Sequence, residues 1–344
     1  MRGIDSRSYV LRLNADGCHP SPSLVCRGPE NVLSVLNGRR VEDGVKLAGL
    51  LFPICPRAHQ SAALRAAEAA MGININPGQA AARQAIVLAE AIAACVWRSA
   101  LDWPRLMGEP GLPEPVRRAR AASDGLVRAI YPGEWARPGG ARLSPNLAEL
   151  RQARSELSAS VNQILAMEAR IIAHTEACLG GVQLETCGGL GDLIGDTRFQ
   201  PGASRAEETP LSFNHGERAA VHVWEWFAAQ IDHAFALLAE MLASLEALAD
   251  DTPMPVVGRP AGSGIGISMT ARGRLRHLMS VDAGIITNWR STAPTDWNFN
   301  ADGPVIHYLQ SLDTDRVREA ARWVIAALDP CAPCEVQVLE HAHA

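Results

Sequence analysis

The spacing of hydrophobic residues predicts a chain made mainly of helices. Six stretches have the apolar periodicity or alanine content typical of helices, at 61–71, 80–101, 114–130, 147–179, 216–248 and 314–328. The alternation of a half-buried strand is confined to short segments such as 8–13. We therefore expect a mainly helical α+β fold with a few short strands, built as one domain over residues 1–344.

The last quarter of the chain places several polar groups on neighbouring turns. Segment 281–289 is apolar and alternating, and it lies between two polar corners. This pattern predicts a hairpin that delivers Arg272 at one bend and Thr295 at another. The helix predicted at 314–328 then leads directly into Asp329.

Composition and charge argue against several classes of protein and of binding partner. A chain of 344 residues with 47% hydrophobic content can bury a large core, and its net charge of −5 gives no reason to expect nucleic acid or a membrane surface as partner. Eight cysteines at irregular spacings do not resemble a disulfide framework. Residues 1–13 contain scattered charges and no continuous apolar run, so we expect neither a signal peptide nor a membrane span there, and a cytoplasmic location.

Two cysteines near the end of the chain predict half of a metal site. Cys331 and Cys334 are three positions apart on a proline-rich turn, and thiolates are soft ligands for iron, nickel, copper or zinc. The candidate for the other half is Cys55, at a junction into a helix, with His59 four residues further on. At a helix start, we expect the Cys55 thiolate to be stabilised by the helix dipole and by exposed backbone amides.

Three other features have structural interpretations. Glu30 lies in the first turn of a helix predicted at 29–36, where the helix dipole favours a carboxylate. Cys95, inside an apolar helix, is interpreted as a small buried core residue. The glycines at 262, 264 and 266 resemble those of a phosphate-binding loop, but the segment lacks the lysine of such a loop. We therefore interpret it as a mobile turn entering a strand.

Five short motifs together resemble those of nickel-iron hydrogenase large subunits. They occur in that family's order, from one end of the chain to the other, at residues 27–30, 55–59, 271–273, 294–298 and 329–334. The resemblance implies a large-subunit-like helical core with the metal site formed between the segments near 55 and at 331–334. By the same resemblance, Arg272 and Thr295 stand where the family contacts the diatomic ligands of iron, and Glu30 stands where it has a proton-transfer carboxylate.

The chain departs from that family at two positions that matter for the metal. Phe52 stands where the family has the first cysteine of its amino-terminal motif, and Gln337 stands where it has a histidine near the processing site. The resemblance makes Cys55 and Cys334 the pair that binds iron and Cys331 a terminal nickel ligand. Since Phe52 offers no donor atom, one nickel ligand is missing, and we expect iron without nickel.

This pattern is similar to the HupK or HoxV type of hydrogenase maturation protein. That resemblance implies a scaffold and not an enzyme, which transiently holds iron with its cyanide and carbon monoxide ligands through Cys55, Cys331 and Cys334. Arg272 and Thr295 would surround the diatomic ligands, His59 would donate to a thiolate, and Glu30 would have an inherited structural role. The implied partners are maturation chaperones of the HypC/HypD type and the hydrogenase large-subunit precursor.

Two alternatives remain open from the sequence. A working nickel-iron hydrogenase subunit would oxidise hydrogen and would require nickel. A structural zinc protein would close a Cys₃His site from Cys55, His59, Cys331 and Cys334.

Overall fold

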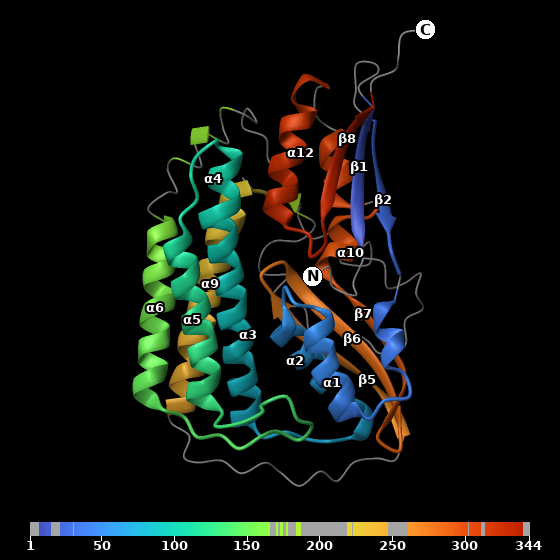
Figure 1. The fold of residues 1–344 in the computed structure, drawn as a ribbon, viewed down its shortest axis with the longest axis vertical. Helices are drawn as coiled ribbons and strands as arrows, with labels where there is room; N and C mark the ends of the chain where they lie inside the picture. Colours follow the sequence, from blue (N-terminus) through green and yellow to red (C-terminus); the bar gives the residue numbers. More distant parts are fainter. Residues whose placement is uncertain are drawn as a thin grey trace.

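A computed structural model describes most of the chain, including the segments that carry the candidate site. The described residues are 7–14, 21–29, 31–165, 170, 173–174, 177, 184–186, 219–221, 223–246, 261–301, 303–310 and 314–339. Long helices lie side by side in one half of the molecule, and two small sheets with their covering helices form the other half (Figure 1). The described elements are consistent with the predicted mainly helical α+β class, because helices contain most of the residues in regular structure, although two strands reach ten residues.

The helical half is formed by α3 and its neighbours. Its helices are α3 (Pro77–Trp97), α4 (Trp103–Leu106), α5 (Pro113–Ile130), α6 (Leu147–Leu165) and α9 (Val223–Glu246). The Asn76 side chain starts α3 by accepting a hydrogen bond from the Gln79 amide at 2.7 Å, and Pro77 occupies the first helical position. A π-helical segment, Arg98–Asp102, joins α3 to α4. The helices predicted at 80–101 and 114–130 are thereby confirmed.

One helical stretch has the length and composition of a membrane span. It is Pro77–Leu106, and 67% of its most apolar window is buried inside the molecule. Because its apolar side chains already contact other elements of the fold, we interpret it as the core helix of a folded domain.

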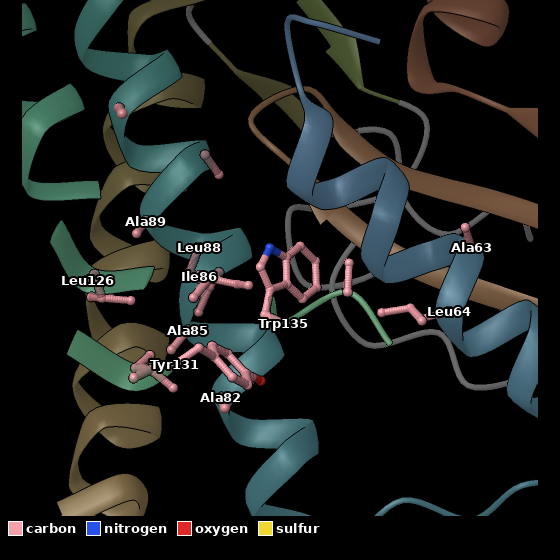
Figure 2. Packing of buried hydrophobic residues seen from close by; sticks show 14 of the residues in the cluster. Ala63, Leu64, Ala82, Ala85, Ile86, Leu88, Ala89, Leu126, Tyr131 and Trp135 are labelled. Atoms are coloured by element: carbon pink, nitrogen blue, oxygen red, sulfur yellow. The ribbon is translucent and has the colours of Figure 1, made fainter. Parts of the chain in front are cut away.

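The main core forms where α2 (Pro56–Met71), α3 and α5 meet the loop after α5. Figure 2 shows Trp135 of that loop between labelled residues of α3 and of α2, with Tyr131 beside it. A buried ion pair fixes the same region, since Arg83 binds Glu68 through two contacts at 2.8 and 2.9 Å. Each partner also forms a hydrogen bond with the loop backbone, which ties the loop to the helices.

Helix α2 packs unusually closely against a three-stranded antiparallel sheet. The sheet has the order β5 (Ala261–Thr270), β6 (Gly273–Asp282) and β7 (Ile285–Thr292), and α1 (Val41–Leu51) lies beside α2. Cβ atoms added at Gly262, Gly264 and Gly266 would lie 2.2, 2.2 and 1.9 Å from carbonyl oxygens of α2. The prediction of a mobile turn is therefore wrong, because these glycines lie within β5 and allow the helix backbone to approach the strand.

A second sheet joins the two ends of the chain. Strand β1 (Ser8–Asn14), predicted at 8–13, pairs antiparallel with β2 (Ser21–Arg27) and parallel with β8 (Cys334–Leu339). Helix α12 (Thr314–Leu328) covers this region with the bounds that the sequence predicts, and the second core cluster includes Trp103 and Trp323 in edge-to-face contact at 5.8 Å (Figure 1). Strand β8 was not predicted.

Two predicted helices differ from the structure and a third is only partly described. The helix predicted at 216–248 is shorter in the structure, where α9 covers Val223–Glu246. Residues near its predicted start form strand β4 (Ala219–Val221), which pairs with β3 (Leu184–Thr186). Instead of the helix predicted at 29–36, a short 3₁₀ helix, η1 (Val32–Leu36), is present. For the stretch predicted at 147–179, α6 covers the first part, and most residues beyond Leu165 lie outside the described part of the chain.

Candidate metal centre

Cys55 is held at the start of α2 by a carboxylate from another helix. It is the residue before the first helical position, occupied by Pro56, and its side chain is buried. The Glu90 carboxylate, from α3, accepts hydrogen bonds from the backbone amides of Arg57 at 2.9 Å and Ala58 at 3.0 Å. Glu90 therefore acts as a helix cap supplied from outside the helix.

This cap changes the expected chemistry of the Cys55 thiol. The amides of Arg57 and Ala58 donate to Glu90, and Pro56 has no N–H, so the first turn offers Cys55 little hydrogen bonding. Burial raises the pKa of Cys55 above its usual value, and the Arg272 charge opposes the increase. The expectation of a thiolate stabilised by the helix start is thus wrong, since desolvation outweighs the favourable charge.

Arg272 lies at the bend between β5 and β6, where the sequence predicts it. The Thr270 hydroxyl accepts a hydrogen bond from the Arg272 amide at 3.1 Å and fixes the turn. The guanidinium donates through Nε to the Asp329 carbonyl at 2.5 Å, and Nη2 forms an ion pair with the Asp329 carboxylate. Its Nη1 is buried and has no hydrogen-bond partner among the described residues. One NH₂ group of a buried cation is therefore available to bind an acceptor.

Asp329 organises the end of α12 and connects two cations. Its backbone is left-handed, with φ of 43°, which turns the chain out of the helix towards Cys331. Its carboxylate also binds Arg98, from the π-helical segment after α3, at 2.7 Å. Arg98 is buried, and the sequence pattern did not single it out because the contact joins elements more than 200 positions apart.

Two of the candidate ligands lie close enough to the Arg272 guanidinium to interact with it when they are ionised. Burial lowers the pKa of Arg272, but the Asp329 carboxylate and then the ionised forms of Cys55 and Cys331 raise it, and the net shift is upward. Cys95 contributes a weaker interaction of the same sign. Cys95 is buried in the main core cluster, as interpreted from the sequence, and it lies close enough to the Arg272 charge for the two to interact.

Thr295 holds the backbone of Cys331. It lies in the short helix α10 (Pro294–Asn298) and is buried, and its hydroxyl oxygen accepts a hydrogen bond from the Cys331 amide at 3.1 Å. The Asp296 carboxylate fixes the helix by accepting from the Ala293 amide at 2.8 Å and pairing with Arg7 at 2.7 Å. A hydroxyl that accepts from one group can still donate its own hydrogen to another, so Thr295 can contact both Cys331 and a bound ligand.

Cys334 occupies a different environment from Cys55. It begins β8 opposite Tyr9 of β1 and packs against the second core cluster, whereas Cys55 belongs to a small cluster with Val87 and Leu275. Burial raises the pKa of Cys334 to about 11, and a hydrogen bond with the Leu11 backbone limits the increase. Both thiols are therefore neutral at physiological pH in the metal-free protein.

His59 is buried within α2 and contacts a second histidine. Its Nδ1 lies 3.0 Å from Nε2 of His277, on β6, and the Phe52 ring stacks on its imidazole. Burial lowers the pKa of His59 well below its usual value and lowers that of His277 to about 3. Both rings are neutral, so His59 can serve as a hydrogen-bond donor and not as a fixed cation.

The candidate ligands do not converge into a metal-binding group among the described residues. Within the described part of the chain, no three His, Cys, Asp or Glu side chains converge closely enough to hold a metal ion. Neither the predicted iron set of Cys55, Cys331 and Cys334 nor the alternative Cys₃His zinc set is assembled in this conformation. Glu30 lies outside the described residues.

Comparison with known sequences finds relatives along almost the whole chain. No protein-family model matches the sequence. The hydrogenase expression/formation protein HupV of Azotobacter chroococcum mcd 1 is 31% identical over 322 residues, which covers 89% of this chain and 90% of that protein. HupK of Azotobacter vinelandii is also 31% identical, over 318 residues and the same shares of both chains. HoxV of Cupriavidus necator matches a shorter part, 38% identical over 102 residues.

Solved structures with a similar fold are nickel-iron-selenium hydrogenases. A chain of the Desulfovibrio vulgaris Hildenborough enzyme in the reduced state aligns with a TM-score of 0.61 at 14% identity, covering 94% of this chain and 98% of that chain. The Dm. baculatum enzyme aligns with a TM-score of 0.63 at 12% identity and the same coverage. At this level of identity the likeness concerns the fold, which is that of a nickel-iron hydrogenase large subunit.

Proposed function

Since this chain belongs to the family of hydrogenase expression/formation proteins that includes HupV and HupK, we propose that it acts in hydrogenase maturation as a holding site for iron. The cargo is the iron unit with two cyanide ligands and one carbon monoxide. It is held until its transfer to the hydrogenase large-subunit precursor. Maturation chaperones of the HypC/HypD type deliver it, and nickel is not part of the site.

The observation that carries the proposal is the free Nη1 group of Arg272. This nitrogen is buried without a partner among the described residues, on a cation that interacts with the thiols of Cys55 and Cys331. A buried N–H of a guanidinium is stable only if it finds an acceptor, and an anionic cyanide nitrogen is a strong one. Contacts with Asp329 occupy Nε and Nη2, so the orientation of the Nη1 NH₂ group is fixed before any cargo arrives.

The thiols supply the iron ligands in this proposal. Cys55 and Cys334 bind iron, and Cys331 is a third thiolate held in place by Thr295. Because burial raises the pKa of Cys55 and of Cys334, both are neutral before loading, and iron binding must release their protons. We therefore expect the cargo to bind more tightly as the pH rises.

The open arrangement suits a temporary holder. Among the described side chains no three-ligand group is already formed, so binding must draw the turn at 329–334 towards Cys55. Part of the binding free energy is then used to rearrange the protein, which weakens retention relative to a preformed site. Weaker retention favours transfer to a partner that binds the same unit more tightly.

Infrared spectroscopy of protein purified anaerobically, from a strain that synthesises the cyanide ligands, tests the proposal. We expect stretching bands of cyanide and carbon monoxide in the wild type and their loss in Cys55→Ser and Cys334→Ser. Cys26→Ser is the matched control, because Cys26 is an exposed thiol on β2, and it should keep the bands.

Three results would overturn the holding site. Absence of the bands, together with normal hydrogenase maturation in strains carrying Cys55→Ser or Cys334→Ser, would remove it directly. Nickel bound with iron, together with hydrogen uptake, would instead identify a working hydrogenase. One equivalent of zinc without iron would identify a structural zinc site.

A further inference from the structure

Four rings form a continuous series beside the start of α2, and three of them are buried. The Phe52 ring, at the end of α1, stacks on His59 with ring centroids 3.6 Å apart and planes within 6°. His59 Nδ1 lies 3.0 Å from His277 Nε2, and Trp289 Nε1, on β7, donates to His277 Nδ1 at 2.9 Å. His59, His277 and Trp289 are at most 2% exposed. The three buried rings therefore link α2, β6 and β7 without access to solvent, and the half-buried Phe52 ring adds the end of α1.

The tryptophan decides where each imidazole proton lies. An indole nitrogen can only donate, so Nδ1 of His277 must accept and carries no proton. The single proton of this neutral ring is then on Nε2, which must donate to Nδ1 of His59. Nδ1 of His59 accordingly accepts, and the His59 proton is on Nε2. Both tautomers follow from the hydrogen bonds alone, because a second proton on either ring would place two N–H groups face to face.

We propose that His277 and Trp289 are positioning residues that hold His59 as a neutral Nε2–H donor of fixed orientation. Trp289 donates a hydrogen bond to His277, and His277 donates one to His59. Each accepting ring nitrogen therefore already has a donor. His59 cannot pass its proton back along the series without breaking the bond from Trp289. The residue is thus a one-way donor and not a proton shuttle. What receives its hydrogen bond, a thiolate of the iron site at the start of α2, rests on the proposed function.

Phe52 restrains the His59 imidazole by stacking on its ring face. The nearly parallel stack at 3.6 Å limits rotation of the imidazole plane, since a rotated ring would collide with Phe52 or lose its bond to His277. His59 is also fixed by its backbone, which donates to the Cys55 carbonyl at 3.1 Å. Phe52 thus restrains the orientation of the His59 ring, although its own side chain cannot bind a metal.

NMR of the metal-free protein with isotope-labelled histidines reads these tautomers directly. Long-range proton–nitrogen correlations at neutral pH distinguish protonated from unprotonated ring nitrogens, and the signals of His59 are assigned by their loss in His59→Gln. We expect Nε2–H on both His59 and His277. In His277→Leu the donor to His59 is gone, so His59 should become a mixture of the two neutral tautomers.

His277→Gln is the conservative variant. Its carboxamide oxygen can accept from Trp289 while its NH₂ group donates to His59, so His59 should remain in the Nε2–H form. Trp289→Phe removes the bond that orients His277, and both histidines should then show mixed tautomers. If His277→Leu fails to fold by circular dichroism, the contrast between His277→Gln and Trp289→Phe decides the matter. A purely structural role for the rings would leave the His59 tautomer unchanged in every folded variant.

Two results would overturn the inference. One is a wild-type His59 protonated at Nδ1, and the other is a His59 tautomer that does not change in either His277→Leu or Trp289→Phe. The readout needs no iron, so it is independent of the infrared test. If the infrared bands are absent and the tautomers are as expected, the iron site is wrong and the positioning role stands. If the bands are present and the tautomers differ from those expected, only the positioning role is wrong.

Discussion

At the scale of single residues, the site depends on how buried polar groups are satisfied. Glu90 accepts from two amides at the start of α2, and Asp329 pairs with both Arg98 and Arg272. Each contact fixes a neighbour of a thiol and does not itself supply a metal ligand. In a low-dielectric interior such bonds are costly to lose, because the remaining partner stays desolvated.

Replacement of Glu90 by Gln should remove a pH dependence of stability. Burial raises the pKa of this carboxyl to about 7 from its usual 4.5. Since the folded state holds the proton more tightly, the stabilising contribution of this group is complete below the unfolded pKa and is lost as the pH rises through the folded pKa. The stability of the wild type relative to Glu90→Gln should fall by about 2 to 3 kcal/mol over this range.

Urea unfolding at several pH values between these limits measures that difference. The variant keeps the shape of the side chain, so its curve supplies the pH dependence of all other groups. Parallel pH dependences of wild type and variant would show that Glu90 has the same pKa in the folded and unfolded states.

Replacement of Arg272 by Lys should weaken iron retention while keeping the charge. Lysine has no fork of N–H groups, so it cannot bind Asp329 through two nitrogens and also offer a third group to a ligand. We expect roughly ten- to hundredfold weaker retention of iron. The measurement is iron per protein after anaerobic purification and dialysis. Arg290→Lys, at an exposed position on β7, is the control, and equal iron content in both variants would contradict the assigned role of Arg272.

At the scale of elements, close packing of α2 on β5 places Cys55 relative to Arg272. The three glycines of β5 meet the backbone of Ala62, Ala66 and Ala70, on the face of α2 that continues towards the Cys55 end. Because β5 leads directly into the turn that carries Arg272, displacement of the helix from the strand would also separate the thiol from the guanidinium.

Gly266→Ala should therefore destabilise the protein. Its Cβ would lie 1.9 Å from the Ala62 carbonyl oxygen, so the helix must move away, at a cost of about 3 kcal/mol. Gly125→Ala in α5 is the matched control, since its nearest neighbour is the end of a flexible arginine at 3.9 Å, and it should stabilise by about 1 kcal/mol. Thermal unfolding of both variants provides the comparison. Equal stabilities would contradict the close approach of α2 and β5.

Some features of the site could be predicted from local sequence signals, and others depend on contacts between elements. Local signals predicted the end of α2 at Met71, the bend with Arg272 and the end of α12 before Asp329, because proline, glycine and apolar periodicity act over a few residues. The start of α2 at Pro56 lies five residues before the predicted start, because the Glu90 carboxylate caps it from another helix. The contacts of Glu90 with Arg57, of Arg98 with Asp329 and of His59 with His277 join separate elements. No local pattern contains such tertiary contacts, and the glycine spacing of β5 became interpretable only beside α2.

At the scale of the whole molecule, the two ends of the chain meet in one sheet. Strand β8 starts at Cys334 and pairs in parallel with β1, so the last cysteine motif is attached to β1. Parallel pairing between the two ends depends on the folded arrangement of everything between them, which explains why β8 could not be predicted. The turn at 329–334 thus connects α12 to this sheet.

The central claim is that the protein holds the iron unit and then gives it up. Its most direct test is to mix anaerobically purified, iron-loaded protein with metal-free hydrogenase large-subunit precursor, separate the two, and record the infrared spectrum of each. We predict that the cyanide and carbonyl bands disappear from this protein and appear in the precursor. Bands that remain entirely with this protein, or a loaded protein that shows no such bands at the start, would contradict the claim.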